Sequence, residues 1–281
     1  MPNLTKDIVK EKENIDKITN MILSWDEFRS KTKYESRYTF LLEESNQEGI
    51  LSPKEFLEAV CTFISNNHKK LIVDLSSKTK IFRAREFKYL EENFDDAKEL
   101  GTPPTNCACK ANRFNPIGIP IFYGSFDEDT AEKELYPTEK YVVVGEFHVF
   151  GSIKILDLTA VDTLDISDDS GDSDSFEKYA REFLIGFSKS LSSEVLDKLE
   201  LDYVPTQIVS EYFYKIGLKN FNIRGIKYRS SKNHNSSNIV LFFKNEDCVN
   251  PTNKKSNSLV LTSRNVYLRD FNYLYDSKFC E

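Results

Sequence analysis

The sequence has few of the residues that mark metal sites and disulfide-stapled folds. It contains three histidines and five cysteines, and its one C-x-C pair, Cys107 and Cys109, has no second pair to match it. Because structural zinc is usually held by four such ligands, no dedicated metal site is expected. An odd number of scattered thiols is typical of a reducing compartment, so the sequence predicts a cytoplasmic protein.

Signals for membrane or nucleic-acid binding are also lacking. No apolar run approaches the roughly 18 residues that a membrane-spanning helix needs, and residues 1–13 are polar and charged, unlike a secretory signal. The net charge is -7, whereas a nucleic-acid binder usually presents a basic surface. Neither a membrane nor a nucleic acid is therefore predicted as a partner.

Common catalytic and nucleotide-binding motifs are missing too. Without G-x-S-x-G, the nucleophile turn of a serine hydrolase is not indicated. Without G-x-x-x-x-G-K-[ST], or G-x-G-x-x-G after a strand, neither a P-loop nor a Rossmann site is indicated. The chain can nevertheless build a substantial core, because 40% of it is hydrophobic and it contains 21 Phe and 14 Tyr.

Residues 1–78 are predicted to form a helical accessory domain. Apolar side chains recur at helical spacing from Ile8 to Trp25. Ser52 and Glu55 then flank a proline in the pattern of a capping box with proline at the first helical position. This segment has neither strand alternation nor a candidate catalytic group.

Residues 79–260 change to short strands and helices, and 261–281 are predicted to be a C-terminal tail. Alternating or β-branched residues predict strands at Ile81–Arg85, Ile119–Tyr123, Tyr141–Phe150, Ile153–Leu158, Ile223–Tyr228 and Ile239–Phe243. Gly151 separates the third and fourth of these, which are expected to form a hairpin or a pair of adjacent strands. The mixed element order, without βαβ alternation, predicts an α+β fold with a mixed sheet core and flanking helices.

The helices of this region are predicted from caps and spacing. Ser125 and Glu128 form a second capping box, which opens a short helix that carries Glu134. An acidic Ser/Asp run over 167–175, whose spacing does not match a calcium loop, leads into a long helix.

A further helix is expected to start at Pro205, to turn Ile216 inward and to end with Gly217 as its C-cap. In the tail, the aromatic-rich stretch 266–275 is expected to form an edge strand or to pack on the core.

The segment from Arg113 to Glu134 arranges a cation, an aromatic ring and a carboxylate along a loop, a strand and a short helix. Arg113 can form two hydrogen bonds to a diphosphate, or can hold the ribose end of a dinucleotide. The ring of Tyr123 can stack on nicotinamide, and Glu134 can stabilise a cationic sugar. This order predicts an enzyme that acts on NAD, with NAD as a consumed substrate and no other cofactor.

Five short motifs in order resemble the RES family, which is named for Arg, Glu and Ser. They are Arg113-Phe-Asn-Pro-x-Gly, Ile121-Phe-Tyr123, Thr130-Ala-x-x-Glu134, Tyr203-x-Pro-Thr-Gln207 with Glu211, and Gly225-Ile-x-Tyr-x-Ser230 followed by Asn238-x-x-Leu-Phe242. The family fold is related to ADP-ribosyltransferase toxins, so the resemblance implies an ADP-ribosyltransferase-like core preceded by an extra helical region. The loop before Arg113 departs from the pattern, since it is rich in Cys and Lys where many members have consecutive glycines.

The resemblance implies catalytic roles for Arg113, Tyr123, Glu134 and Ser230. The hydroxyl of Ser230 would bond the ligand amide or orient Glu134, although Ser231 beside it leaves the choice between the two serines open.

Three further residues are candidates for binding NAD. Arg83 and Arg85 are two apart on a predicted strand, so they point to one face and one of them can reach a phosphate. The ordinary alternative is a pair that borders the core. Asn238 is expected to fix the loop that follows Ser230 through its side chain. Gln207 and Glu211 are expected to support the fold.

The function implied by the resemblance is hydrolysis or phosphorolysis of NAD by a toxin or defence effector that depletes the host cell's NAD. It also implies an antitoxin protein as a partner, and a homo-oligomer is left open. One alternative is transfer of ADP-ribose to a protein, and another is a non-catalytic interaction module with a degenerate RES fold. The sequence does not decide whether water, phosphate or a protein side chain accepts the ADP-ribose.

Overall fold

The computed structural model describes most of the chain between residues 28 and 269. The described residues are 28–39, 42, 52–89, 92, 94–135, 138–164, 173–192 and 200–269. The predictions for Ile8 to Trp25, for most of the acidic run 167–175 and for the aromatic stretch beyond residue 269 lie outside them. Within these ranges, no helix combines the length and the apolar character needed to cross a membrane.

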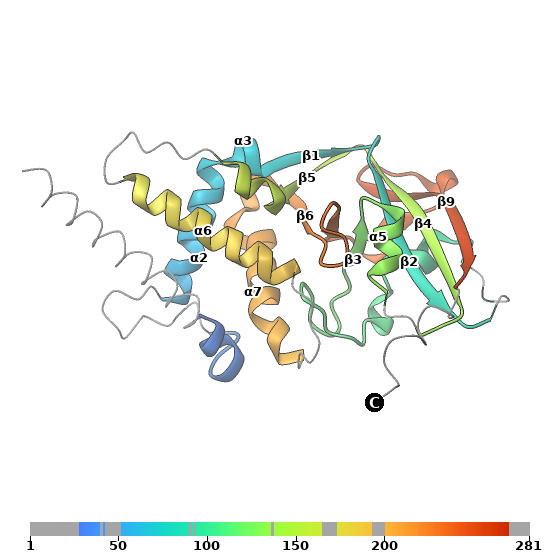
Figure 1. Cartoon of the computed structure of the whole chain (residues 1–281), viewed down its shortest axis with the longest axis horizontal. Helices are drawn as coiled ribbons and strands as arrows, with labels where there is room; N and C mark the ends of the chain where they lie inside the picture. The colour runs from blue at the N-terminus through green and yellow to red at the C-terminus, as the bar shows by residue number, and fades with distance from the viewer. Residues whose placement is uncertain are drawn as a thin grey trace, which may run out of the picture. The chain divides into compact units, whose positions relative to one another are not determined.

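A nine-stranded sheet is the main feature of the fold (Figure 1). In their order along the sheet, the strands are β1 (Ile72–Ser76), β5 (Ser152–Asp157), β6 (Ile223–Arg229), β7 (Ser237–Leu241), β3 (Phe122–Ser125), β2 (Lys80–Phe87), β4 (Tyr141–Phe150), β9 (Ser258–Leu268) and β8 (Cys248–Val249). The pairs β2–β4, β3–β7, β4–β9 and β6–β7 are antiparallel, and β8–β9 is parallel. The predicted mixed α+β class is therefore confirmed.

The sheet narrows at the joint between β2 and β3. These two strands meet in one residue pair, Phe82 with Ser125, whereas β2 and β4 pair from Lys80 to Phe87. Arg83 and the residues after it therefore have a backbone partner on β4 but none on β3. Along this stretch, the edge of β2 that faces β3 has side chains beside it and no paired strand within the described residues.

The chain forms two compact units, each built from several chain segments. The first unit comprises the described residues within 1–73, 111–116 and 156–223, and the second comprises those within 74–110, 117–155 and 224–281. The second unit holds the sheet, apart from terminal residues of β1, β5 and β6, together with α4 (Ala97–Leu100), η2 (Thr105–Cys107), α5 (Glu128–Lys133), η7 (Asn245–Asp247) and η8 (Pro251–Asn253). The predicted boundaries at residues 78 and 260 stay a prediction.

The first unit contains most of the helices. They are α2 (Pro53–Asn66), α3 (His68–Leu71), η3 (Leu158–Thr163), α6 (Ser173–Ser192), η4 (Glu200–Tyr203), α7 (Val204–Tyr212), η5 (Phe213–Gly217) and η6 (Lys219–Phe221). Helices α2 and α6 pack against each other (Figure 1). Their buried side chains include Leu57, Phe63, Ile64, Leu184, Phe187 and Leu191, so the expected apolar stripes form the core of this unit.

The helix starts bear out one predicted cap and correct another. The Ser52 hydroxyl accepts from the Glu55 N–H, and the Glu55 carboxylate accepts from the Ser52 N–H, so the first capping box is confirmed. The second prediction is wrong, because α5 is capped by Asp127 in place of Ser125. Ser125 is the last residue of β3, and its hydroxyl donates to the Ser237 carbonyl, which holds it in the sheet.

Two strand predictions also need correction. The strand predicted at Ile119–Tyr123 begins at Phe122, because Pro120 has no N–H to contribute to a ladder. The strands β4 and β5 are consecutive in the chain, as predicted, but they are not neighbours in the sheet. Strand β4 lies between β2 and β9, which occupy both of its edges, and Gly151 with φ 104° turns the chain away.

The helix predicted from Pro205 to Ile216 changes type before it ends. The α-helix stops at Tyr212, and residues Phe213–Gly217 form a π-helical turn with Leu218 as the cap. The wider turn rotates later side chains around the axis, so Ile216 is 55% exposed, contrary to the prediction. Gly217 is not the C-cap either. A Cβ at Gly217 would lie 2.3 Å from the Cys61 Sγ, so its place is set by close packing.

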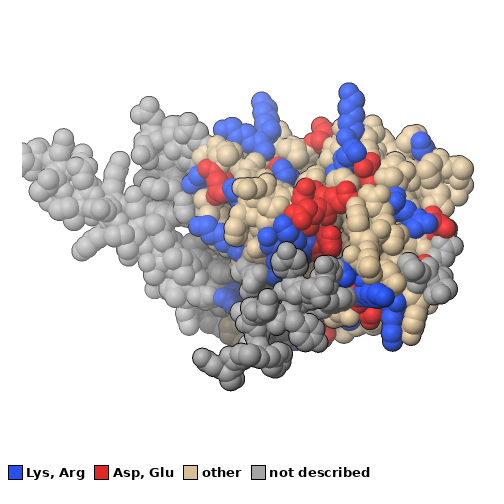
Figure 2. Space-filling model, turned by 45° about the vertical axis from the view of Figure 1, so that its right-hand side comes forward, with Lys and Arg blue, Asp and Glu red and all other residues tan. Residues whose placement is uncertain are grey.

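The surface carries both signs of charge close together. Figure 2 shows acidic and basic side chains interspersed on the face in view. Ion pairs between surface side chains include Lys80–Glu146 and Lys133–Asp129.

Candidate active site

Glu134 lies at the C-terminal end of α5, where a short but well-capped helix places it. The Asp127 carboxylate accepts hydrogen bonds from the N–H of Thr130 at 2.8 Å and from its hydroxyl at 2.6 Å. The Glu134 N–H in turn donates to the Thr130 carbonyl at 3.1 Å. These hydrogen bonds fix the backbone of Glu134. The residue itself is exposed to solvent.

Two side chains, one from the β6–β7 loop and one from β7, donate to one oxygen of this carboxylate. The Ser230 hydroxyl lies 2.7 Å from Glu134 Oε1, and the Asn238 Nδ2 lies 2.6 Å from the same atom. The other oxygen, Oε2, has no hydrogen bond within the described part of the chain. Ser230 and Asn238 are both buried, at 1% and 4% exposure. The carboxylate is therefore anchored through one oxygen and presents the other.

The hydrogen bonds around Ser230 settle which way its hydroxyl points. Its Oγ accepts from the N–H groups of Lys232 and Asn233 at 3.1 and 3.2 Å. With both lone pairs engaged, the hydroxyl proton is directed at Glu134. The choice between Ser230 and Ser231, which the sequence left open, is decided as far as contact with Glu134 is concerned.

A second connection joins the β6–β7 loop to α5, and the sequence analysis missed its loop residue, Asn233. The Asn233 Nδ2 donates to the Thr130 hydroxyl at 2.8 Å, and that hydroxyl donates to Asp127. Asn233 also accepts from the Asn235 N–H through its side-chain oxygen. The signal was present in the sequence, since an asparagine in a tight turn commonly bonds nearby backbone groups.

Arg83 and Arg85 lie half-buried on β2, beside the narrow joint. The Arg83 Nη1 donates to the Tyr123 carbonyl at 2.7 Å, and its guanidinium lies 5.3 Å from the Phe122 ring centroid. The Arg85 Nη2 donates to the Gly101 carbonyl at 3.2 Å. Both Nε atoms are buried without a hydrogen-bond partner. Among the described residues, neither guanidinium forms an ion pair with a carboxylate.

Burial lowers the pKa of both cations. Burial, and secondly the neighbouring charge of Arg85, lower the pKa of Arg83 to about 9. Burial likewise lowers the pKa of Arg85. A cation held away from water without an ion-paired carboxylate is costly, so this pair favours an anion.

The strand register assigns faces to the candidate residues. Ser125 pairs with Asn238 and Tyr123 with Val240, so Tyr123, Ser125 and Asn238 share one face of β3 and β7. Phe82 pairs with Ser125, and Arg83 alternates to the opposite face of β2. No hydrogen bond or ion pair within the described residues joins Arg83 or Arg85 to Glu134.

Arg113 belongs to the first unit, in a turn that α7 holds in place. Its carbonyl accepts from the Thr206 hydroxyl at 2.5 Å. The Gln207 Nε2 donates to the Asn112 and Asn115 carbonyls at 2.8 and 3.0 Å. Gln207 thus makes the supporting contacts expected of it. Tyr123, Glu134, Ser230 and Asn238 belong to the second unit, which is the one that brings Glu134, Ser230 and Asn238 together.

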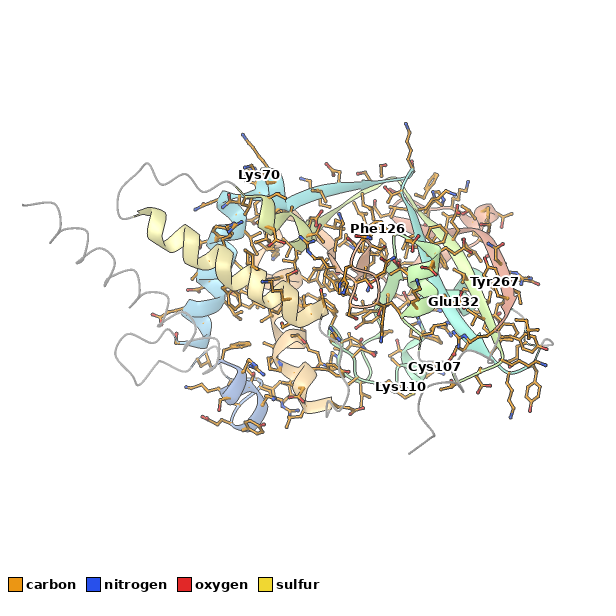
Figure 3. All side chains as sticks on the ribbon, viewed as in Figure 1. Lys70, Cys107, Lys110, Phe126, Glu132 and Tyr267 are labelled. Carbon is orange, nitrogen blue, oxygen red and sulfur yellow. The ribbon has the colours of Figure 1, made fainter. Side chains whose placement is uncertain are left out.

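Figure 3 labels two further features of the second unit. Cys107 is the last residue of η2 and Lys110 follows it in the chain before Arg113, and the Cys107 thiol is free and exposed. Glu132 lies on α5, and its carboxylate is 3.9 Å from the Nε of Arg269, the residue that follows β9. Within the described residues, no group of His, Cys, Asp or Glu is arranged to hold a metal ion.

A comparison with protein-family models matches residues 80–261 to the RES domain. The chain belongs to the RES family. The resemblance seen in the sequence motifs is thereby confirmed, and membership fits a role connected with NAD. A search of curated proteins finds no match. All the RES motif residues discussed above, from Arg113 to Asn238, lie inside the matched range.

Proposed function

We propose that this RES protein cleaves the nicotinamide–ribose bond of NAD. The observation that carries the proposal is the Glu134 carboxylate, which Ser230 and Asn238 anchor through one oxygen while the other stays available. The position of Glu134 within a RES-family range supports reading it as a functional acid. An ordinary helix-end glutamate on a surface would not require two buried donors.

In the proposed reaction, the bond between the ribose C1′ and the nicotinamide nitrogen breaks, and its electron pair leaves with neutral nicotinamide. The ribose then carries positive charge. A carboxylate beside the ribose stabilises this charge, since it is already oriented before the reaction begins. An acceptor attacks C1′, and Glu134 Oε2 can take a proton from it if that acceptor is water. The products of hydrolysis are nicotinamide and ADP-ribose.

The proposal assigns anion binding to the two β2 arginines, which lie on the face of the sheet opposite to Tyr123 and Asn238. Arg83 and Arg85 are half-buried and lack a carboxylate partner among the described residues, which is the condition under which a diphosphate is favoured. Tyr123 would stack on nicotinamide and Arg113 would bind the dinucleotide, as the family resemblance implies. These three roles extend the same proposal, and no metal or further cofactor takes part.

At the level of the cell, the proposed role is that of a toxin or defence effector that depletes NAD in the cytoplasm. An antitoxin protein that blocks the site is the partner expected from the family. The proposal includes the ADP-ribosyltransferase-like fold relationship of the sheet core.

The first test measures nicotinamide release from NAD by the purified full-length protein. Glu134→Gln should lower the rate about a hundredfold or more, because the amide keeps the shape and removes the charge. Glu132→Gln, on the same helix but facing Arg269, is the matched control and should retain the parent rate.

The products identify the acceptor. Soluble ADP-ribose indicates water, ADP-ribose 1″-phosphate indicates phosphate, and label retained on a protein indicates transfer. A parent protein that releases no nicotinamide under any of these conditions would refute the proposal and favour a non-catalytic module.

A further inference from the structure

The two oxygens of the Glu134 carboxylate differ in their hydrogen bonds. Both donors, from Ser230 and Asn238, converge on Oε1, at 2.7 and 2.6 Å. Hydrogen bonds to an ionised oxygen are stronger than those between neutral groups, and two of them fix the plane of the carboxylate. Oε1 therefore serves to hold the group, and Oε2 is the oxygen that can face a reacting sugar.

The amide of Asn238 has one orientation that is compatible with this arrangement. Its Nδ2 must face the carboxylate, because its Oδ1 in that position would set two acceptors against each other. With Nδ2 so placed, Oδ1 is buried and has no hydrogen-bond partner. Leaving a buried acceptor unpaired is costly. The orientation of the amide is thus determined by its bond to Glu134.

The sheet fixes Asn238 at the required place. It lies on β7 opposite Ser125 of β3 on one side and Tyr228 of β6 on the other. It is paired on both edges and 4% exposed, so water does not compete for the amide, and its backbone cannot shift without disturbing three strands. Ser230, by contrast, lies just past the end of β6, in the loop.

We infer that Asn238 is a positioning residue for the reaction, which acts through Glu134 and not by binding NAD. This inference rests on the proposed function. It replaces the expectation that Asn238 fixes the loop after Ser230. That loop is held by other groups, namely the backbone N–H groups of Lys232 and Asn233 and the side chain of Asn233.

The test compares kcat and KM for NAD cleavage in three substitutions of Asn238. Asn238→Ala removes one anchor and should lower kcat about 10- to 100-fold with KM within about twofold of the parent, because misplacement by a fraction of an ångström affects the transition state most. Asn238→Ser keeps a donor and should recover part of kcat. Asn238→Asp keeps the shape but opposes two carboxylates, and should have the lowest kcat of the three.

Asn250→Ala is the matched control. The Asn250 side chain is also polar and bonds a backbone group, the Ala97 N–H at 2.9 Å, but it lies away from Glu134 in the hydrogen-bond network. This variant should lose some thermal stability and keep the parent kcat. Melting curves of all the variants show whether each one folds. If Asn238→Ala does not fold, the kcat of Asn238→Ser tests the inference in its place.

The outcomes separate the inference from the function on which it depends. An unchanged kcat in folded Asn238→Ala and Asn238→Ser overturns the positioning role while NAD cleavage stands. A raised KM with the parent kcat also overturns it, because that result assigns Asn238 to direct contact with NAD. A kcat that is highest in Asn238→Ser, lower in Asn238→Ala and lowest in Asn238→Asp supports the inference. A parent protein that is inactive on NAD overturns both.

Discussion

The hydroxyl of Ser230 accepts two backbone N–H groups and donates to a carboxylate, so its rotation is fixed by three partners. Its neighbour in the sequence, Ser231, has none of these contacts. Two adjacent serines of the same size thus differ in their hydrogen bonds, and only Ser230 contacts Glu134. This difference makes them a natural pair for a substitution experiment at the scale of single residues.

Ser230→Ala should lower nicotinamide release about tenfold or more, because Glu134 then keeps one anchor of two. Ser231→Ala should leave the rate unchanged. Initial rates of NAD cleavage at saturating NAD are the measurement. Equal rates in the two variants would remove Ser230 from the site.

The arginines of the second unit offer a contrast in charge pairing. Arg83 is half-buried and donates to a backbone carbonyl, whereas Arg269 forms an ion pair with Glu86 in which both side chains are largely buried. Removing one partner of a buried pair leaves an uncompensated charge, but removing an unpaired buried charge relieves a cost.

Arg83→Met should therefore leave the free energy of unfolding unchanged or raise it, while Arg269→Met should lower it by about 3 kcal/mol. Urea unfolding at neutral pH and without NAD measures both. The same Arg83→Met protein should lose the thermal stabilisation that NAD gives the parent. A large destabilisation by Arg83→Met alone would contradict the assignment of Arg83 to ligand binding.

At the scale of elements, the stability contributed by a side chain of β4, Glu146, depends on pH. Burial raises the pKa of Glu146, but hydrogen bonds from His148, Lys80 and Thr262 outweigh burial and bring the pKa below its ordinary value of 4.5. The folded protein thus holds the proton more weakly than the unfolded chain. The stability from this group is present above about pH 4.5 and is lost as the pH falls through the lowered pKa.

Glu146→Gln should flatten the acid side of the stability curve. Relative to the parent, the variant is expected to be less stable at pH 7 and to lose less stability between pH 7 and pH 3. Urea unfolding at a series of pH values measures the difference. Parallel curves for the two proteins would show that the Glu146 contacts are too weak to matter.

Local signals in the sequence predicted the individual elements well. Alternation at Ile81–Arg85 marks β2, and the pattern of Ser52 and Glu55 marks the start of α2. Where prediction failed, a distant partner decided the outcome. Ser125 could cap a helix by its sequence, but its hydroxyl is engaged by Ser237, which lies 112 positions later.

The candidate site could be predicted only in part, because its contacts also join residues that are distant in the sequence. A family resemblance singled out Glu134 and Ser230, but these residues are 96 positions apart, and no local rule states that they share a hydrogen bond. Their meeting requires the order β6–β7–β3 in the sheet. Asn233 escaped prediction altogether, because its bond to Thr130 exists only once the β6–β7 loop lies against α5.

At the scale of the whole molecule, both halves of the chain are needed for each compact unit. The chain passes from one unit to the other after residues 73, 110, 116, 155 and 223. The two units therefore share several covalent connections, and no single peptide serves as their linker. A protease that cuts the backbone at one of these crossings would divide the chain into two fragments, and at least one unit would be built from both of them. The packing inside that unit should therefore hold the fragments together until the protein is denatured.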